Sequence, residues 1–153
     1  MIRNAYFQKP MVNIAIVMAT LLYAGIMISL LFFLDRPVLS EYSYNLTPFE
    51  TINQYIVNRD YFSTRTWVKN LFGNIVLFIP IGICLPLLNR ANFRFVRFLL
   101  IALTILVLIE GTQLITRLGS FDVDDLLLNA FGACIGYGVI RIFIKSVFKR
   151  KPF

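Results

Sequence analysis

Histidine is absent from this chain of 153 residues, and only two residues are cysteine. Without histidine, neither a Ser-His catalytic triad nor a histidine-ligated metal site can form. Cys84 and Cys134 both lie inside apolar runs, which indicates buried apolar side chains rather than a disulfide or a reactive thiol. Charge is scarce as well, because Asp, Glu, Lys and Arg make up only 15% of the chain. These absences leave a small number of carboxylates, amides and arginines as the features to explain.

Hydrophobic residues, in contrast, make up 58% of the chain, and the mean hydropathy is +0.74. Globular domains carry about 45–50% apolar residues. The excess lies in long runs, and about 20 consecutive apolar residues suffice to span the hydrocarbon core of a membrane. We therefore expect an all-α integral membrane protein with a single domain over residues 1–153. The expected fold is a bundle of four transmembrane helices, over residues 11–34, 71–88, 98–116 and 123–144, plus a short extracytoplasmic interfacial helix.

The interfacial helix is expected between residues 47 and 58. Thr47, Pro48 and Glu50 fit a capping box, with Thr47 as the N-cap. Apolar residues at positions 49, 52, 55 and 56 then fall on one face, as in a helix that lies in the plane of a membrane surface. The alternative is an ordinary ordered loop.

The basic residues are placed unevenly. With four spans, one side of the membrane receives the N-terminus, the 89–97 link and the C-terminus, which carry ten basic residues and no acidic one. Basic residues concentrate on the cytoplasmic side of membrane proteins, so both termini are expected in the cytoplasm. Because the basic residues flank apolar spans, membrane topology explains the net charge of +7 better than nucleic-acid binding does.

Polar residues within the last three spans recur at matching depth near the outer side. Glu110, Gln113 and Arg117 are spaced for one face of a helix, and Asn74 and Asn129 lie at similar depth on the neighbouring spans. A polar side chain in a membrane usually faces a protein interior or a water-filled cavity. We therefore expect a common outward-facing ligand pocket formed by Asn74, Glu110, Gln113, Arg117, Asp122, Asp125 and Asn129, with Asn70 in the same slab.

Each of these residues also has a plainer interpretation. Asp122 and Asp124 are suited to capping the fourth span and complementing its helix dipole. Asn74 and Asn129 are suited to interhelical hydrogen bonds, and Arg117 to a position at the membrane surface. Glu110 is the hardest to explain in this way, because a buried carboxylate must be paired, hydrogen-bonded or protonated.

Two backbone features belong to the same spans. Gly132 and Gly136 form a GxxxG motif, which is more typical of close helix packing than of a ligand site. Pro80 lacks the amide that would bond the carbonyl of Val76, so a kink or local widening is expected near the middle of the second span.

Several motifs together resemble the VanZ-like family of bacterial membrane proteins. They are Asn45–Phe49 (NLTPF), Gly73–Gly82 (GNIVLFIPIG), Glu110 with Gln113, Asp122–Asp125 (DVDD), and Asn129 with Gly132 and Gly136. The resemblance implies a multi-span protein of the bacterial cytoplasmic membrane. Its name-giving member is associated with resistance to the lipoglycopeptide teicoplanin without a change in the D-Ala-D-Ala target. No catalytic residue can be carried over from the family, and we expect no cofactor.

Three functions remain open at this stage. The first is a non-enzymatic protein of the cell envelope, in contact with membrane lipids, whose pocket binds a lipoglycopeptide or a lipid-linked cell-wall precursor, with Arg117 on a phosphate or carboxylate. The second is a membrane-embedded enzyme with Glu110 as acid or base, or with a divalent cation on Asp122, Asp124 and Asp125. The third is a structural or transport bundle. Neither the ligand nor the oligomeric state follows from the sequence.

Overall fold

The computed structural model describes residues 10–34 and 38–149, and the side chains as far as residue 146. The fold is all-helical, as expected, and four of its helices are long and apolar enough to cross a membrane. The expected topology of the two termini falls largely on residues outside the described ranges. The four candidate spans are Pro10–Phe33, Thr64–Leu88, Phe95–Thr116 and Val123–Ser146.

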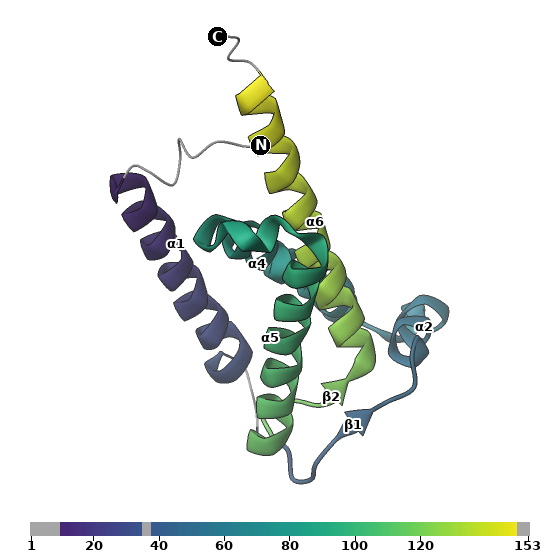
Figure 1. Ribbon diagram of the computed structural model, residues 1–153. Coiled ribbons are helices and arrows are strands. Elements are labelled where there is room, and N and C mark those ends of the chain that lie inside the picture. The colour runs from purple at the N-terminus through teal and green to yellow at the C-terminus, as the bar shows by residue number, and fades with distance from the viewer. Residues whose placement is uncertain (1–9, 35–37, 150–153) are drawn as a thin grey trace.

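The first span lies along one side of the molecule (Figure 1) and consists of helix α1 (Pro10–Ile28) and a π-helical turn η1 (Ser29–Phe33). The Tyr23 hydroxyl donates a hydrogen bond of 2.7 Å to the carbonyl of Leu77, which attaches α1 to helix α4. Of the residues in this span, only Met27 and Leu31 are buried. Its exposed apolar side chains are suited to contact with lipid.

The polar segment after the first span differs in part from expectation. Strand β1 (Tyr44–Asn45) pairs in parallel with strand β2 (Phe121–Asp122), and the sequence did not predict this pairing. Helix α2 (Glu50–Val57) begins three residues after Thr47, so the expected capping box does not form. Phe49 occupies the N-cap position with a left-handed backbone, φ 65°, and a carboxylate from another helix caps α2 instead. A 3-10 turn, η2 (Arg59–Tyr61), then leads to the second span.

The second span begins at Thr64 rather than at residue 71, because the Ser63 side chain caps helix α3 (Thr64–Val68) through the Thr66 amide. A π-helical segment, η3 (Lys69–Gly73), continues into α4 (Asn74–Leu88). The helix remains α-helical through Pro80, so the local widening lies in η3 and not at the proline. The 3-10 turn η4 (Arg90–Phe93) connects α4 to helix α5 (Phe95–Thr116).

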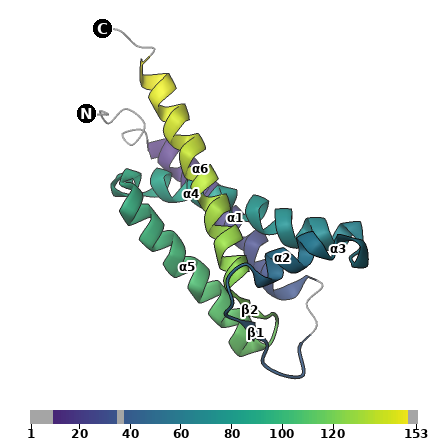
Figure 2. The ribbon, with the colours of Figure 1, turned by 90° about the vertical axis from the view of Figure 1, so that its right-hand side faces the viewer.

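Helix α4 crosses the last helix, α6 (Val123–Lys149), at an oblique angle and in close contact (Figure 2). A Cβ atom built on Gly132 would lie 2.1 Å from the carbonyl oxygen of Ile75, and one on Gly136 would lie 1.9 Å from that of Ile79. Side chains at these positions would force the helices apart, so the prediction that the GxxxG motif packs helices is confirmed. The core around this contact comprises Met27, Leu31, Phe78, Ile81, Phe98, Ala102, Leu106, Ala133 and Tyr137.

Helices α5 and α6 meet at their polar ends, where the β1–β2 pairing and α2 also lie (Figures 1 and 2). The chain turns here because Arg117 adopts a left-handed backbone, φ 56°, and ends α5. The polar residues of three helices and one loop are thereby brought to one end of the molecule.

Candidate functional site

A cavity of about 250 Å³ lies at this end, between α4, α5 and α6. Helix α2 contributes Thr51 and Tyr55 to its wall, and the first span contributes Leu31. The polar side chains expected to converge are present in it with one exception, Arg117. The full set of lining residues is Leu31, Thr51, Tyr55, Asn70, Asn74, Glu110, Gln113, Gly119, Ser120, Asp122, Asp125 and Asn129.

Glu110 lies deep in this cavity, with 4% of its surface exposed. Asn129 of α6, which is 2% exposed, donates its amide N–H to Glu110 Oε1 over 3.4 Å. One turn along α5, Gln113 donates to the carbonyl of Leu31 over 3.0 Å. The Glu110–Asn129 pair therefore joins α5 to α6, and Gln113 joins α5 to the first span.

The opposite wall comes from the second span and the start of α6. The Asn74 amide donates to the carboxylate of Asp125, as their matching depth predicts. Asn70, in the π-helical segment η3, donates to the Tyr55 hydroxyl over 2.6 Å. A π-helical turn displaces side chains relative to a regular helix, and such turns occur frequently at functional sites.

Tyr55 closes the cavity from the α2 side, and it is held by two contacts with the second span. In addition to the hydrogen bond from Asn70, its backbone carbonyl accepts the indole N–H of Trp67 over 3.0 Å. Burial raises the pKa of the Tyr55 phenol, and the negative charges of Asp125 and Asp122 raise it further, while the hydrogen bond from Asn70 acts in the opposite direction. The phenol is therefore kept neutral at the edge of an acidic site.

Asp124 lies outside the cavity lining and has a structural role. It is fully buried, and its two carboxylate oxygens accept the backbone amides of Phe49 and Ile52, the second over 3.0 Å. These amides belong to the N-terminus of α2, where a negative charge is favoured. Asp124 thus attaches α2 to α6.

Asp122 has a similar role and also lines the cavity. Its Oδ1 accepts the backbone amide of Asp124 over 2.8 Å, and its Oδ2 accepts the Thr51 hydroxyl over 2.6 Å. The interpretation of Asp122 and Asp124 as capping residues accounts for these contacts. Across residues 10–34 and 38–149, no three histidine, cysteine or acidic residues are grouped to hold a metal ion, so nothing favours the alternative of a cation on Asp122, Asp124 and Asp125.

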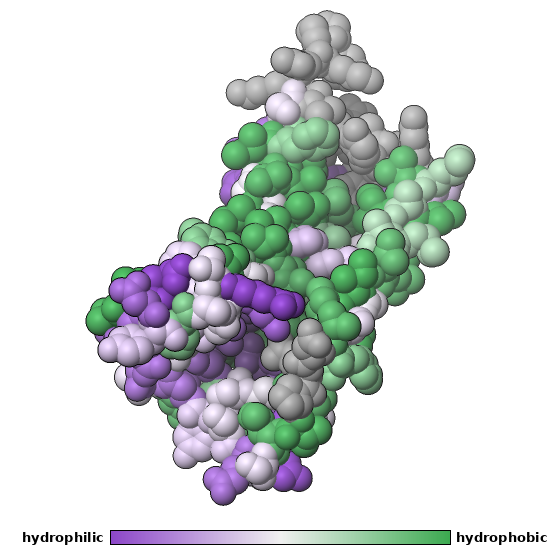
Figure 3. All heavy atoms as spheres, turned by 180° about the vertical axis from the view of Figure 1, so that it is seen from behind, coloured by the Kyte–Doolittle hydropathy of each residue, from purple (hydrophilic) through white to green (hydrophobic). Residues whose placement is uncertain are grey.

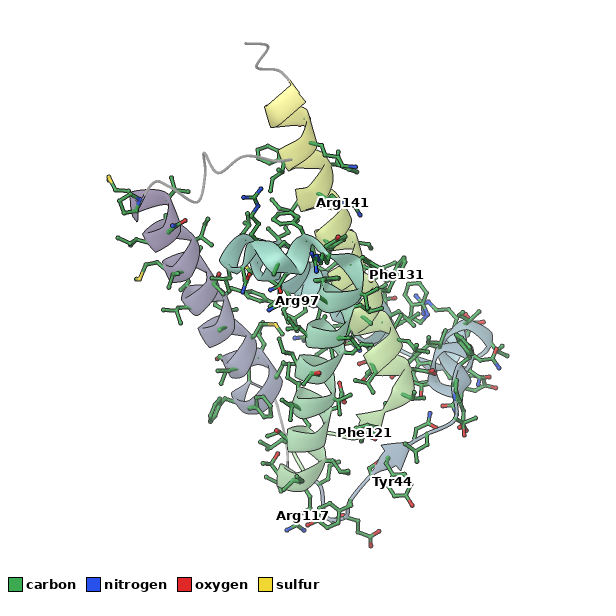
Figure 4. The ribbon with its side chains drawn as sticks, viewed as in Figure 1. Tyr44, Arg97, Arg117, Phe121, Phe131 and Arg141 are labelled. Atoms are coloured by element: carbon green, nitrogen blue, oxygen red, sulfur yellow. The ribbon has the colours of Figure 1, made fainter. Side chains whose placement is uncertain are left out.

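Arg117 is the expected site residue that does not reach the cavity. Because α5 ends at Thr116 and Arg117 turns left-handed, its side chain leaves the face shared by Glu110 and Gln113. It donates to the Ser40 carbonyl over 3.2 Å and lies 5.6 Å from the centre of the Tyr42 ring. Figure 4 shows it at the end of the molecule. Its expected contact with a ligand phosphate or carboxylate remains a prediction that this placement does not support.

Residues from α2 and from the β2 loop were not expected at the site. Thr51 and Tyr55 are spaced i, i+4 and so share a face of α2, which the apolar pattern of that helix concealed. Gly119 and Ser120 line the cavity and directly precede β2, whose Phe121 pairs with Tyr44 of β1 (both labelled in Figure 4). The local sequence predicts neither the face of α2 that lines the cavity nor the pairing of β2 with β1.

Hydrophilic and hydrophobic surfaces are separated along the molecule. Hydrophilic atoms gather around the α2 end, whereas hydrophobic atoms cover the helices beyond it (Figure 3). Phe49 at the N-cap of α2, and Ile56 and Val57 within the helix, are exposed apolar residues. The cavity therefore lies at a boundary between polar and apolar surface.

The family model described as VanZ/LLP1 matches residues 19–144, which is most of the chain. The chain belongs to the VanZ family. It is also similar to Protein VanZ of Enterococcus faecium, with 28% identity over 137 residues that cover 88% of this chain and 83% of the relative. No solved structure matches the chain.

The motifs that carry the VanZ resemblance lie around the cavity or support it. Asn74, Glu110 and Asn129 line it directly. The DVDD motif supplies Asp122 and Asp125 to the lining and Asp124 to the cap of α2. In this VanZ-family protein, a multi-pass membrane bundle thus places its motif residues at one site.

Proposed function

We propose that this VanZ-family protein binds the polar part of an amphiphile in the cavity, while the apolar part lies against the membrane-spanning helices. The observation that supports this most directly is the convergence of Asn74, Glu110, Gln113, Asp125 and Asn129, from three helices, on one cavity. Polar side chains that only hydrogen-bond the helices to one another would need no cavity among them. A cavity of about 250 Å³ among them offers room for a ligand group.

We further propose that the cavity opens toward the outside of the bacterial cytoplasmic membrane. Among the described residues, Arg94, Arg97 and Arg141 belong to the end of the molecule opposite the cavity, and Figure 4 shows Arg97 and Arg141 well apart from Arg117. Because basic residues favour the cytoplasmic side, this end would face the cytoplasm. Helix α2 would then lie at the outer membrane surface and cover the cavity, with Phe49 and Ile56 toward lipid.

The ligand that fits this position is a lipoglycopeptide such as teicoplanin, or a lipid-linked cell-wall intermediate. Both carry a polar head with many hydrogen-bonding groups and a long apolar tail. The relative named Protein VanZ and the family resemblance favour a role in glycopeptide tolerance. Sequestration of such an amphiphile would change its concentration at the membrane surface without a chemical reaction.

Native mass spectrometry of the purified protein would test this proposal. We expect the wild-type protein to retain teicoplanin or a co-purified lipid. Asn129→Ala and Gln113→Ala should lose it while both variants remain folded, although each is less stable by about 1–3 kcal/mol because an interhelical hydrogen bond is lost. Asp60→Asn, which changes an exposed acid of η2 outside the cavity, is the control and should retain ligand. Equal retention in all variants, or loss only in variants that unfold, would contradict the proposal.

An enzymatic function is favoured by one observation, the burial of the Glu110 carboxylate inside the cavity. A buried carboxylate can act as a general acid or base. Glu110→Gln separates the two functions. If the protein is an enzyme, this variant should still bind the amphiphile but no longer convert it. A binding protein would show no chemically altered ligand in either the wild-type or the variant protein.

A further inference from the structure

The cavity is rich in carboxylic acids. Three of its lining residues, Glu110, Asp122 and Asp125, are carboxylic acids, and no lysine or arginine of the described chain is among the others. The remaining polar lining groups are amides and hydroxyls, which are neutral. A ligand group placed among them would meet carboxylate and carbonyl oxygens on several sides.

A second, independent feature points to a missing hydrogen-bond donor. Asn129 is 2% exposed and lines the cavity, and its Oδ1 atom has no hydrogen-bond partner within the described parts of the chain. A buried acceptor without a partner costs about 1–3 kcal/mol, so such atoms usually meet a ligand or an ordered water. Its amide N–H is already directed to Glu110. The free side of Asn129 is therefore an acceptor that a donor group could satisfy.

Two arginines of the segments that flank the cavity, Arg59 and Arg117, make their contacts outside its lining. Arg59 donates to the Phe62 carbonyl over 3.2 Å and lies 4.9 Å from the centre of the Trp67 ring. Arg117 is directed to Ser40 and Tyr42. A phosphate group in the cavity would have neither guanidinium beside it and would lie next to carboxylates.

Building on the proposed function, we infer that the ligand group held in the cavity is a protonated primary amine carried by an amphiphile. An ammonium group has three donors and no acceptor, which matches carboxylates together with the Asn129 carbonyl oxygen. A charge-assisted hydrogen bond of this kind is about twice as strong as a neutral one. The raised pKa of Tyr55, caused by burial and by Asp125 and Asp122, agrees with a negative potential at the same place.

Three probes of equal chain length test this inference: dodecylamine, neutral N-dodecylacetamide and anionic dodecyl phosphate. Their binding to the full-length protein in nanodiscs can be followed by the fluorescence of Trp67, the single tryptophan, which contacts α2. We expect dodecylamine to bind about tenfold more tightly than the other two. Asp125→Asn should remove most of this preference, and the matched control Asp60→Asn should preserve it.

The amine could belong to a membrane lipid or to a lipoglycopeptide, and two further comparisons, or arms, of the experiment distinguish these sources. One compares nanodiscs containing phosphatidylethanolamine with nanodiscs containing its N-acetylated form, and the other compares teicoplanin with teicoplanin acetylated on its primary amine. Loss of binding on acetylation in either arm supports the amine and identifies its source. Loss in neither arm overturns the inference.

The outcomes also separate this inference from the proposed function on which it rests. Tighter binding of dodecyl phosphate, weakened by Arg117→Ala, would overturn the amine inference and leave amphiphile binding in place. Equal binding of all three probes would do the same. If no probe, lipid or lipoglycopeptide binds to a folded wild-type protein, both proposals fail together.

Discussion

Asp124 lies in the first turn of α6, but its carboxylate caps a different helix. It accepts two amides at the start of α2, whereas Asp122 accepts the Asp124 amide at the start of α6. Two acids of one motif, separated by Val123, therefore serve two helix ends. Because a local capping residue for α2 is missing, the fold of α2 depends on its contact with α6.

Replacement of Asp124 by alanine should release α2. The loss of a helix cap costs about 0.5–2 kcal/mol, so the amides of residues 49–57 should exchange hydrogen faster in Asp124→Ala than in the wild type. Hydrogen–deuterium exchange measured by mass spectrometry would show this. The exchange of α5 peptides should not change, and unchanged protection of α2 would contradict the role assigned to Asp124.

Tyr55 reports the charge of the cavity. The pKa of its phenol lies above 10.0, because burial first and then Asp125 and Asp122 disfavour the phenolate. The folded state thus holds the proton more tightly than the unfolded chain does. The stabilisation that results is present below pH 10 and is lost as the pH rises through the folded pKa.

The ultraviolet absorbance of tyrosinate, compared between the wild type and Tyr55→Phe, isolates this titration. Asp125→Asn should lower the pKa of Tyr55 without returning it to the ordinary value, since burial is the larger cause. If Asp125→Asn left the pKa of Tyr55 unchanged, this result would contradict the placement of the two residues around one cavity.

Single residues show where prediction from sequence fails. The spacing of Glu110, Gln113 and Arg117 predicts one helical face, and the first two do line the cavity. Arg117 departs because α5 ends one residue before it, and its left-handed backbone is stabilised by contacts with residues 39–42 that are remote in sequence. Local periodicity does not contain this information.

Among elements, the apolar spans are the part that sequence predicts well. All four were expected, and the first span is displaced by only one residue at each end. The second span starts earlier than its apolar run, because Ser63 caps a polar first turn. The two-residue strands and the start of α2 were missed, since both depend on pairing between residues about 75 positions apart in the chain.

The α4–α6 contact should be the least tolerant of added volume. In Gly136→Ala, the new methyl group would meet the Ile79 carbonyl at 1.9 Å, so the helices must separate at a cost of about 1–3 kcal/mol. Resistance to unfolding by sodium dodecyl sulfate measures this loss.

Gly138, two residues further along α6, provides the matched control. Apart from the neighbouring backbone of α6 itself, no atom lies within 4 Å of a Cβ built there. Gly138→Ala should be neutral or stabilising by up to about 1 kcal/mol, because alanine favours helix more than glycine does. If both variants lost stability equally, helix packing would not be the cause.

For the whole molecule, the expected orientation can be tested by cysteine labelling in intact cells. Tyr61 is 88% exposed in η2 and Arg94 is exposed beside η4, whereas Asn92 is buried and unsuited to labelling. A membrane-impermeant thiol reagent should label Tyr61→Cys and not Arg94→Cys, because we expect the basic end to face the cytoplasm. After permeabilisation both should be labelled. The reverse pattern in intact cells would invert the orientation.

At this scale the sequence predicts that a site exists, and the structure defines its boundary. Depth along the spans placed Asn74, Glu110 and Asn129 together, because helical rise is regular. The roof formed by Thr51 and Tyr55 depends on the tertiary cap of α2 by Asp124, which no local pattern contains.

The central claim is that the cavity beneath α2 is occupied by an amphiphile. Photo-crosslinking in cells tests it most directly, with benzoylphenylalanine in place of Tyr55, which lines the cavity, and of Tyr61, which lies outside it. We predict a lipid or lipoglycopeptide adduct at position 55 that is absent at position 61 and is reduced by Asn129→Ala. An equal yield of adducts at both positions, or a position 55 that crosslinks only to the protein itself, would contradict the account.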